Sequence, residues 1–165
     1  MEHSYAIALG SNRPHGRHGA PEQVVRAAIR ELASLGRVER VSRIHRTAAL
    51  GPAGRSFANA AILLASDLEP LPLLASLKAI ERRFGRRAGR GWGPRVLDLD
   101  ILLWSGGRFS DRRLEIPHPH FRERGFVLAP ASEIAPGWRD PVTRLSIRQL
   151  RARWQRRAAI RILSS

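Results

Sequence analysis

Residues 95–103 read Arg-Val-Leu-Asp-Leu-Asp-Ile-Leu-Leu. Apolar and acidic side chains alternate in this stretch, which is the pattern of a strand with one buried face. The odd-numbered residues from Leu97 to Leu103 share one face, which we expect to belong to the core. Asp98 and Asp100 share the other face, with Cα atoms about 7 Å apart and side chains pointing the same way.

The two carboxylates allow two interpretations. Side by side they repel each other unless a cation lies between them. Mg²⁺ takes one or two carboxylates together with phosphate oxygens, and a site with two ions about 4 Å apart also fits. The alternative is a solvent-exposed strand face whose carboxylates pair with arginines. The acidic pair alone leaves both interpretations open.

Residues 82–95, RRFGRRAGRGWGPR, lead directly into this strand and mix arginine with glycine. Such a segment can fold over a polyphosphate, where its guanidinium groups offset charge that develops during phosphoryl transfer. It could equally bind RNA, with Trp92 stacked on a base. Its position next to the two carboxylates favours a nucleoside triphosphate bound together with magnesium.

The apolar periodicity outside this region predicts an α+β fold. The expected strands cover residues 5–9, 38–46, 57–65 and 96–104. Helices are expected to begin near Pro21 and Pro70. This order is the ferredoxin-like split β-α-β pattern, a mostly antiparallel sheet backed by helices with one open face.

The last third of the chain has weaker signals. Residues 117–141 are rich in proline, so we expect them to be mostly irregular. A basic helix is expected over residues 145–165, with Leu150, Trp154 and Ile162 on a face packed against the body. Within the irregular part, residues 116–126, IPHPHFRERGF, could contact phosphate, bind metal or stack on a flat ring.

Composition narrows the class of protein. The net charge is +15, and Lys78 is the only lysine. This charge suits a nucleic acid or a phosphorylated substrate, but it also fits a general preference for arginine on solvated faces. The absence of cysteine excludes disulfides, thiolate metal sites and cysteine nucleophiles. We see no phosphate loop of the Gly-x4-Gly-Lys type, no signal peptide and no membrane-length apolar run. We expect one cytoplasmic domain over residues 1–165.

Together these segments resemble the hydroxymethyldihydropterin pyrophosphokinases of folate biosynthesis. The similarity runs from residue 8 to residue 136. Its most specific parts are WGPRVLDLDI at residues 92–101, Pro-His-Pro at 117–119 with Arg-Gly-Phe at 124–126, and RTAALGP at 46–52 with Asn-Ala-Ala at 59–61. The resemblance implies a ferredoxin-like fold and an ATP-dependent enzyme. Its reaction would move pyrophosphate from ATP to 6-hydroxymethyl-7,8-dihydropterin, giving AMP and the pterin diphosphate, with two Mg²⁺ ions.

The same resemblance implies roles for individual residues. The expected magnesium ligands are Asp98 and Asp100. The expected pterin-binding residues are Thr47, Leu50, Phe57, Asn59 and Phe126. The expected ATP-binding residues are Trp92, Arg95, Ile101, His118 and Arg124. The expected catalytic residues are Arg86, Arg87, Arg95, Asp98 and Asp100, with Arg90 as a further arginine of the loop.

Alternative roles remain for single residues and for the whole chain. Phe57 could be plain core, Asn59 a satisfied amide at a strand edge and Trp92 a loop anchor. The chain could instead be a nucleic-acid-binding module, although two carboxylates beside the Arg/Gly segment argue against it. An inactive relative kept for binding is a third option, which the intact carboxylate pair argues against. We expect small-molecule substrates, no specific nucleic acid, no membrane contact and a monomer.

Overall fold

The structure is a computed structural model that describes residues 1–12, 16–47, 56–85 and 96–164. Its main sheet contains five strands: β1 (His3–Ser11), β2 (Arg37–Val41), β3 (His45–Thr47), β4 (Phe57–Ser66) and β5 (Asp98–Trp104). The strand order is β2-β4-β1-β5, β3 also pairs with β4, and every pair is antiparallel. One helix follows β1 and another follows β4. The order of strands and helices along the chain therefore confirms the expected ferredoxin-like β-α-β-β-α-β pattern.

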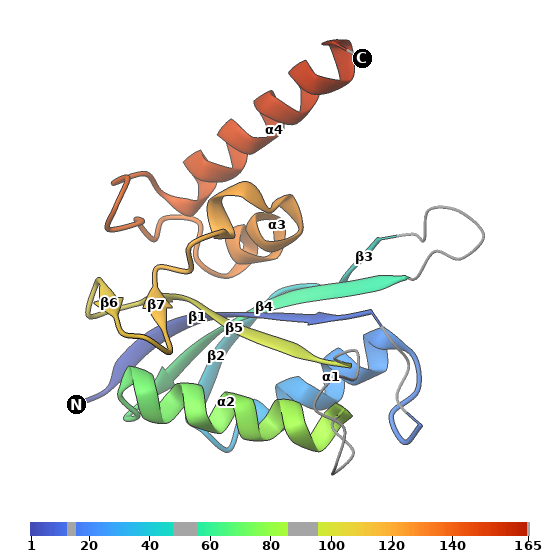
Figure 1. The fold of residues 1–165 in the computed structure, drawn as a ribbon, viewed down its shortest axis with the longest axis vertical. Helices are drawn as coiled ribbons and strands as arrows, with labels where there is room; N and C mark the ends of the chain where they lie inside the picture. Colours follow the sequence, from blue (N-terminus) through green and yellow to red (C-terminus); the bar gives the residue numbers. More distant parts are fainter. Residues whose placement is uncertain (13–15, 48–55, 86–95, 165) are drawn as a thin grey trace.

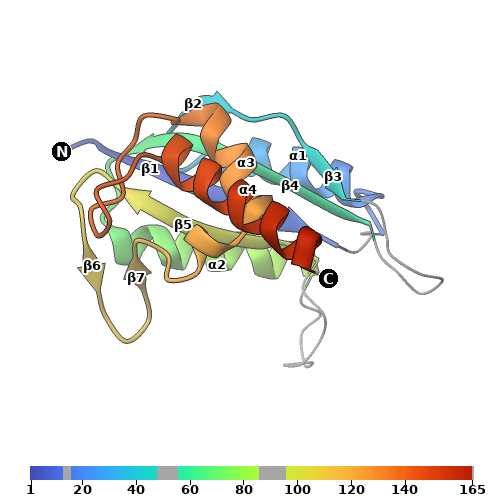
Figure 2. The same ribbon diagram turned by 90° about the horizontal axis from the view of Figure 1, so that it is seen from above.

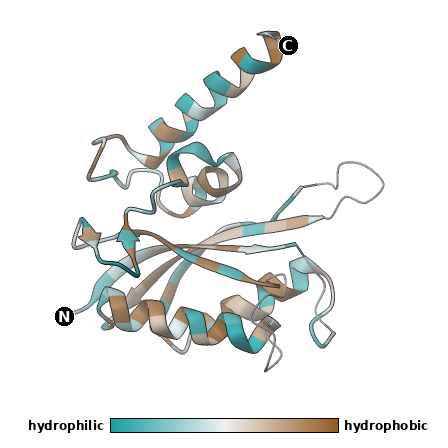
Figure 3. Cartoon of the chain, in the orientation of Figure 1, coloured by the Kyte–Doolittle hydropathy of each residue, from teal (hydrophilic) through white to brown (hydrophobic). Residues whose placement is uncertain are grey.

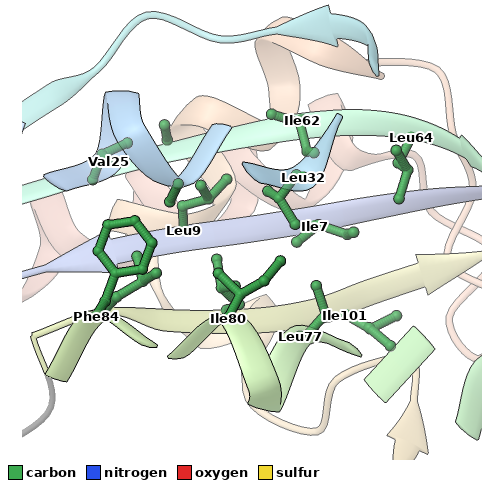
Figure 4. Packing of buried hydrophobic residues seen from close by; sticks show 14 of the residues in the cluster. Ile7, Leu9, Val25, Leu32, Ile62, Leu64, Leu77, Ile80, Phe84 and Ile101 are labelled. Carbon is green, nitrogen blue, oxygen red and sulfur yellow. The ribbon is translucent and has the colours of Figure 1, made fainter. Parts of the chain in front are cut away.

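Those two helices, α1 (Pro21–Leu32) and α2 (Pro70–Gly85), cover one face of the sheet. Both begin at a proline, whose missing N–H costs nothing in the first turn of a helix. The buried side chains of α2 recur at helical spacing and are Leu73, Leu77, Ile80 and Phe84. They meet Ile7, Leu9, Ile62 and Ile101 of the sheet in one core (Figure 4).

The other face of the sheet is partly covered, which corrects our expectation of an open face. A 3₁₀ turn, η1 (Phe121–Glu123), leads into helix α3 (Gly125–Ile134), and α4 (Ile147–Ser164) packs on both of them. Figures 1 and 2 show these helices on the side of the sheet opposite α1 and α2. A second core joins Ala6, Leu102 and Leu103 of the sheet to Leu128 and Leu150.

Helix α3 also shows that the prediction of an irregular segment over residues 117–141 was wrong. Pro130 lies inside this helix, where it removes one backbone hydrogen bond. Val127, Ala131 and Ile134 are spaced for one helical face, and all three are buried. Packing of that face therefore outweighs the local cost of the proline.

Two predictions of side-chain direction also need correction. The pairing of β1 with β5 shifts register between Ala6 and Ile7, so a bulge follows Ile101. The bulge turns Leu103 away from the face of Leu99 and into the second core. In α4, Leu150 is buried and Trp154 is half-buried as expected, but Ile162 is 76% exposed.

A short hairpin, β6 (Phe109–Ser110) and β7 (Glu115–Ile116), follows β5 and leads to the Pro-His-Pro-His segment at residues 117–120. The predicted strand over residues 38–46 is split into β2 and β3. Ser42 lies at the break and still bonds to β4, since its N–H donates to Ala61 O and its Oγ accepts from Ala61 N–H. Among the described residues, no helix is long and apolar enough to cross a membrane.

Candidate functional site

Strand register brings polar residues from distant parts of the chain into one row. Gly10 of β1 pairs with Asn59 of β4 on one side and with Asp98 of β5 on the other. Two residues along the sheet, Ala8 pairs with Asp100 in the same way. Because side chains two apart share a face, the amide and both carboxylates project toward the side of the sheet that carries α3.

A cavity of about 350 Å³ lies over this row. Its lining includes residues 8–11 of β1, together with Arg124, Phe126 and Val127 from the start of α3. A Cβ on Gly10 would lie 3.0 Å from Asn59 Oδ1. The missing side chain at residue 10 therefore leaves the Asn59 amide, which is itself buried, in contact with the cavity.

Two aromatic rings line the cavity and are exposed. Phe57 is 45% and Phe126 is 51% accessible to solvent, which rules out Phe57 as plain core. Exposed rings at a cavity are suited to stacking against a flat ligand. Thr47 of β3 is the register partner of Phe57, and the Arg124 guanidinium lies 6.0 Å from the centre of the Phe126 ring.

Asn59 is not an amide at a sheet edge, since β4 lies inside the sheet between β1 and the β2 and β3 strands. Its neighbour across the sheet is His45 of β3. Strand pairing on both sides of β4, with Gly10 and with His45, thus fixes the position of Asn59. The Asn59 side chain is held on a rigid element beside Phe57, which lies two residues away on the same face.

The carboxylates lie on β5, which β1 separates from Phe57 on β4. His118 approaches Asp100, with 4.0 Å between Nε2 and Oδ2. Its backbone N–H donates to Leu102 O, and its Nδ1 accepts from the His120 N–H, so the neutral ring carries its proton on Nε2. Burial lowers the pKa of His118 below its usual value, while the charge of Asp100 partly opposes this shift.

A second cavity of about 340 Å³ lies at the outer edge of β5 and shares Asp100 with the first. Its lining includes Lys78 and Leu99, as well as Ile101 and His118. Glu81 of α2 accepts the Leu99 N–H at 2.8 Å, and it also pairs with Lys78. By the alternation of an antiparallel ladder, the backbone groups of Ile101 point to this same outer edge.

The donor set in the first cavity suits a hard cation only when a ligand adds oxygens. Within the described part of the chain, no three His, Cys, Asp or Glu side chains gather closely enough to hold a metal ion. Two carboxylates on one strand face are a partial set. Mg²⁺ commonly accepts such a set when phosphate oxygens and water complete its coordination.

The structure brings together most of the residues that the sequence singled out. Phe57, Asn59, Asp98, Asp100, Arg124 and Phe126 all line the first cavity, while Ile101 and His118 line the second. Thr47 lies on β3 beside Phe57. The remaining predicted residues lie outside the described residues and are Leu50, Arg86, Arg87, Arg90, Trp92 and Arg95.

Several residues at the site escaped sequence reasoning. Gly10 and Ser11 at the end of β1 line the cavity, and the sequence Gly-Ser-Asn at residues 10–12 was the only signal for them. Glu81 is a lone acid on α2 with no motif around it, and Glu133 lies in the segment where the family resemblance ends, which implied no role for it. Glu133 of α3 accepts the Arg43 N–H at 3.0 Å and contacts His45 Nε2, and this link joins α3 to β3.

Comparison with known proteins finds a matching family model and similar proteins. The model of the 7,8-dihydro-6-hydroxymethylpterin-pyrophosphokinase family matches residues 6–136. A 2-amino-4-hydroxy-6-hydroxymethyldihydropteridine pyrophosphokinase from Synechocystis is 40% identical over 150 residues, which cover 90% of this chain and 74% of that protein. The protein of the same name from Pseudomonas aeruginosa is 40% identical over 138 residues and 82% of each chain.

Comparison with solved structures finds the same fold. In HPPK-DHPS from Plasmodium falciparum, crystallised as a triple mutant with SDX-DHP, the match has a TM-score of 0.72 at 13% identity. It covers 93% of this chain and 44% of that one. A folate synthesis bifunctional protein from Arabidopsis thaliana is 41% identical over 81% of this chain and 24% of its own length. Similar domains therefore occur within longer proteins.

Proposed function

The chain belongs to the 7,8-dihydro-6-hydroxymethylpterin-pyrophosphokinase family, and on that premise we propose how its cleft carries out the reaction. The protein is an enzyme of folate biosynthesis that transfers pyrophosphate from ATP to 6-hydroxymethyl-7,8-dihydropterin. One observation carries the proposal for its site. A single cavity contains two exposed aromatic rings near a buried amide and two carboxylates beyond them.

In this proposal the pterin lies between Phe57 and Phe126. A flat heterocycle between two rings buries both of its faces, and hydrogen bonds to the surrounding polar groups fix its orientation. Asn59 hydrogen-bonds the edge of the pterin. Thr47 and Leu50 belong to the segment that completes the pterin site, where Leu50 is assigned from the family resemblance alone.

ATP occupies the second cavity, and its phosphates extend past Asp100 into the first. Ile101 offers its backbone groups at the strand edge, and His118 points its Nε2–H toward the phosphate path. Arg124 contacts phosphate from the start of α3. Arg86, Arg87, Arg90, Trp92 and Arg95 are assigned to phosphate binding and closure over ATP from the sequence alone.

Asp98 and Asp100 would hold two Mg²⁺ ions together with ATP oxygens. Bound there, Mg²⁺ supplies positive charge that screens the phosphates from the attacking oxygen. No three-ligand cluster lies among the described residues, so the proposed site depends on ATP for completion. Metal affinity should therefore rise when ATP is present.

The chemical step is an in-line attack of the pterin hydroxyl oxygen on the β-phosphorus of ATP. The new O–P bond forms as the bond between the β-phosphorus and the α-phosphate oxygen breaks, AMP leaves with that electron pair, and the hydroxyl proton is released to water. Asp98 and Asp100 are the only carboxylates among the described lining residues of the first cavity. Since both are assigned to metal, catalysis rests on positioning and electrostatic stabilisation.

Separation of the nucleotides after incubation with Mg-ATP and the reduced pterin tests this proposal. AMP should appear in step with the pterin diphosphate, and only when magnesium and pterin are both present. Asp98→Asn and Asp100→Asn should each lower kcat by at least about 100-fold with the fold intact by circular dichroism. Near-normal turnover in either variant would refute the metal assignment.

We also propose that residues 1–165 form one domain that acts as a monomer in the cytoplasm. Cysteine is absent from the chain, which is compatible with a reducing compartment. Light scattering after size exclusion tests the oligomeric state directly. A mass of twice 18.4 kDa would contradict the monomer.

A further inference from the structure

Helix α4 carries a concentration of positive charge that neither cavity uses. Its 18 residues contain six arginines and no acidic residue, so it holds +6 of the net +15. The helix lies beyond residue 136, where the match to the family ends. No residue of α4 lines either of the two cavities of the site.

Three of the exposed arginines of α4 form a stripe along the helix. Arg153, Arg157 and Arg161 are spaced four residues apart, which puts their side chains on one side at intervals of about 6 Å. All three are exposed. In the described part of the chain, none of them has a carboxylate within salt-bridge distance.

This arrangement costs the helix stability. Like charges four residues apart repel, by roughly 0.2–0.5 kcal/mol for each pair, and no glutamate relieves the repulsion within α4. An external polyanion would turn the same repulsion into attraction. Arginine is also suited to phosphate, because its planar guanidinium offers two parallel donors.

The position of α4 leaves the stripe accessible. Figure 1 shows the first turns of α4 against α3 and the remaining turns extending away from the sheet. Ile147 and Leu150 anchor the first half, while Ile160 and Leu163 near the end are exposed. Figure 3 shows hydrophilic bands along α4 up to its last turn.

We propose that the arginine stripe of α4 binds the phosphate backbone of nucleic acid and that this binding does not depend on base sequence. Charge complementarity favours this partner, since a duplex presents a regular line of phosphates. An anionic membrane fits less well. In-plane binding needs one apolar and one basic face, whereas Ile160 lies on the same side as Arg153 and Arg157 and Ile162 lies on another.

The test measures binding of a fluorescein-labelled DNA duplex of about 20 base pairs and mixed sequence as salt is varied. The variant replaces three arginines together, Arg153→Gln, Arg157→Gln and Arg161→Gln. Each neutralised phosphate contact contributes about 0.9 to the slope of log K against log salt. We expect the slope to become less steep by about 3, with kcat and KM for pyrophosphoryl transfer unchanged.

A matched control variant distinguishes binding by the α4 stripe from binding that depends only on the total charge of the protein. Arg30→Gln, Arg40→Gln and Arg108→Gln remove the same charge from exposed positions on the body. This control should change the slope by less than about 1. Equal loss in the two triple variants would overturn the proposal, because the whole basic surface would then bind the duplex.

Two further measurements separate a charge effect from disturbed packing and from membrane binding. The corresponding triple lysine variant keeps the charge and should keep the steep slope, whereas loss of binding there would point to disturbed packing and would count against a charge-based surface. Glutamine is a good helix former, so helicity should persist in the test variant. Binding to phosphatidylglycerol vesicles that the stripe variant loses, with duplex binding unchanged, would overturn the proposal in favour of a membrane.

Discussion

Gly10 shapes the cleft because it has no side chain. A Cβ at this position would lie 3.0 Å from Asn59 Oδ1, closer than such contacts normally come. In Gly10→Ala we expect the Asn59 amide to rotate away, because the end of a side chain yields more easily than a strand. The KM for the pterin should then rise about tenfold, which corresponds to one lost hydrogen bond, while kcat changes much less.

Gly137→Ala is the matched control, since a Cβ at that position meets nothing within 4 Å. Steady-state kinetics of the two variants, with urea unfolding of each, measures the effect. A pterin KM for Gly10→Ala equal to that of the control would show that Asn59 does not orient the substrate.

Trp154 holds the segment that precedes Phe126. Its Nε1–H donates to Glu123 O at 3.1 Å, and its ring lies so close to Gly125 that a Cβ there would be 2.4 Å from Cη2. Trp154→Phe removes the hydrogen bond together with the outer ring atoms that lie against Gly125. We expect unfolding free energy to fall by about 2 kcal/mol and the KM for both substrates to rise several-fold.

Trp138→Phe serves as the control for a tryptophan change on the same core. Trp138 packs against the second core and lines neither cavity of the site. Its KM values should match those of the unchanged protein. If Trp154→Phe behaves like Trp138→Phe in kinetics, then Trp154 only stabilises the fold.

The residues of the site differ in how far the sequence predicts them. Asp98 and Asp100 are visible because strand alternation places two acids on one face. Gly10 and Glu133 are not, because their roles depend on which strand or helix lies opposite. Glu133 is one acid near the end of α3, and only the packing of α3 onto the sheet brings it to His45.

Among the elements, the link between α3 and β3 joins two parts of the proposed pterin site. Glu133 accepts the Arg43 N–H at 3.0 Å and contacts His45 Nε2. These hydrogen bonds outweigh the effect of burial and hold the pKa of Glu133 below its usual value. Thr47 follows on the same strand, so the position of β3 relative to Phe126 depends on this contact.

In Glu133→Gln we expect the link to weaken, because a neutral amide accepts charged and polar donors less strongly. The KM for the pterin should rise by about fivefold, which is about 1 kcal/mol, with a smaller change in the KM for ATP. Glu123→Gln removes the same charge from an exposed side chain of the neighbouring turn. Parallel changes in both KM values would indicate a general loosening of α3 instead.

The elements themselves were predictable where periodicity was strong and local. Strand β5 and helix α2 follow directly from alternation and from an i, i+4, i+7 pattern. Helix α3 was not predicted, because the prolines of residues 117–141 indicate irregular structure, although Val127, Ala131 and Ile134 are spaced for one helical face. A single proline disfavours a helix locally, but only the sheet beneath α3 supplies the burial that offsets it.

At the scale of the whole molecule, an ion pair with a buried carboxylate joins η1 to the loop that precedes α4. Asp140 is 0% exposed and accepts from Arg122 Nε at 2.5 Å and Nη2 at 2.8 Å. Thr143 Oγ1 and the Val142 N–H also donate to this carboxylate. Arg122 lies in η1, two residues before Arg124, so the pair fixes the segment between the proposed ATP site and α4.

This pair makes stability depend on pH in a defined direction. Burial alone would raise the pKa of Asp140, but the hydrogen bonds from Arg122, Thr143 and Val142 outweigh it and bring the pKa to about 2. Since the unfolded value is higher, at 3.8, the folded state binds the proton less tightly than the unfolded state. Its contribution to stability is therefore complete above about pH 4 and is lost as pH falls through about 2.

Asp140→Asn should lower the free energy of unfolding by about 3 kcal/mol at pH 7, because it leaves the Arg122 charge without its partner. The difference from the unchanged protein should shrink between about pH 4 and pH 2, where Asp140 itself becomes neutral. Urea unfolding over this range measures both quantities. Asp111→Asn, at an exposed pair with Arg113, should change stability little at any pH. A difference for Asp140→Asn that stays constant down to pH 2 would mean that lost packing, and not lost charge, destabilises the variant.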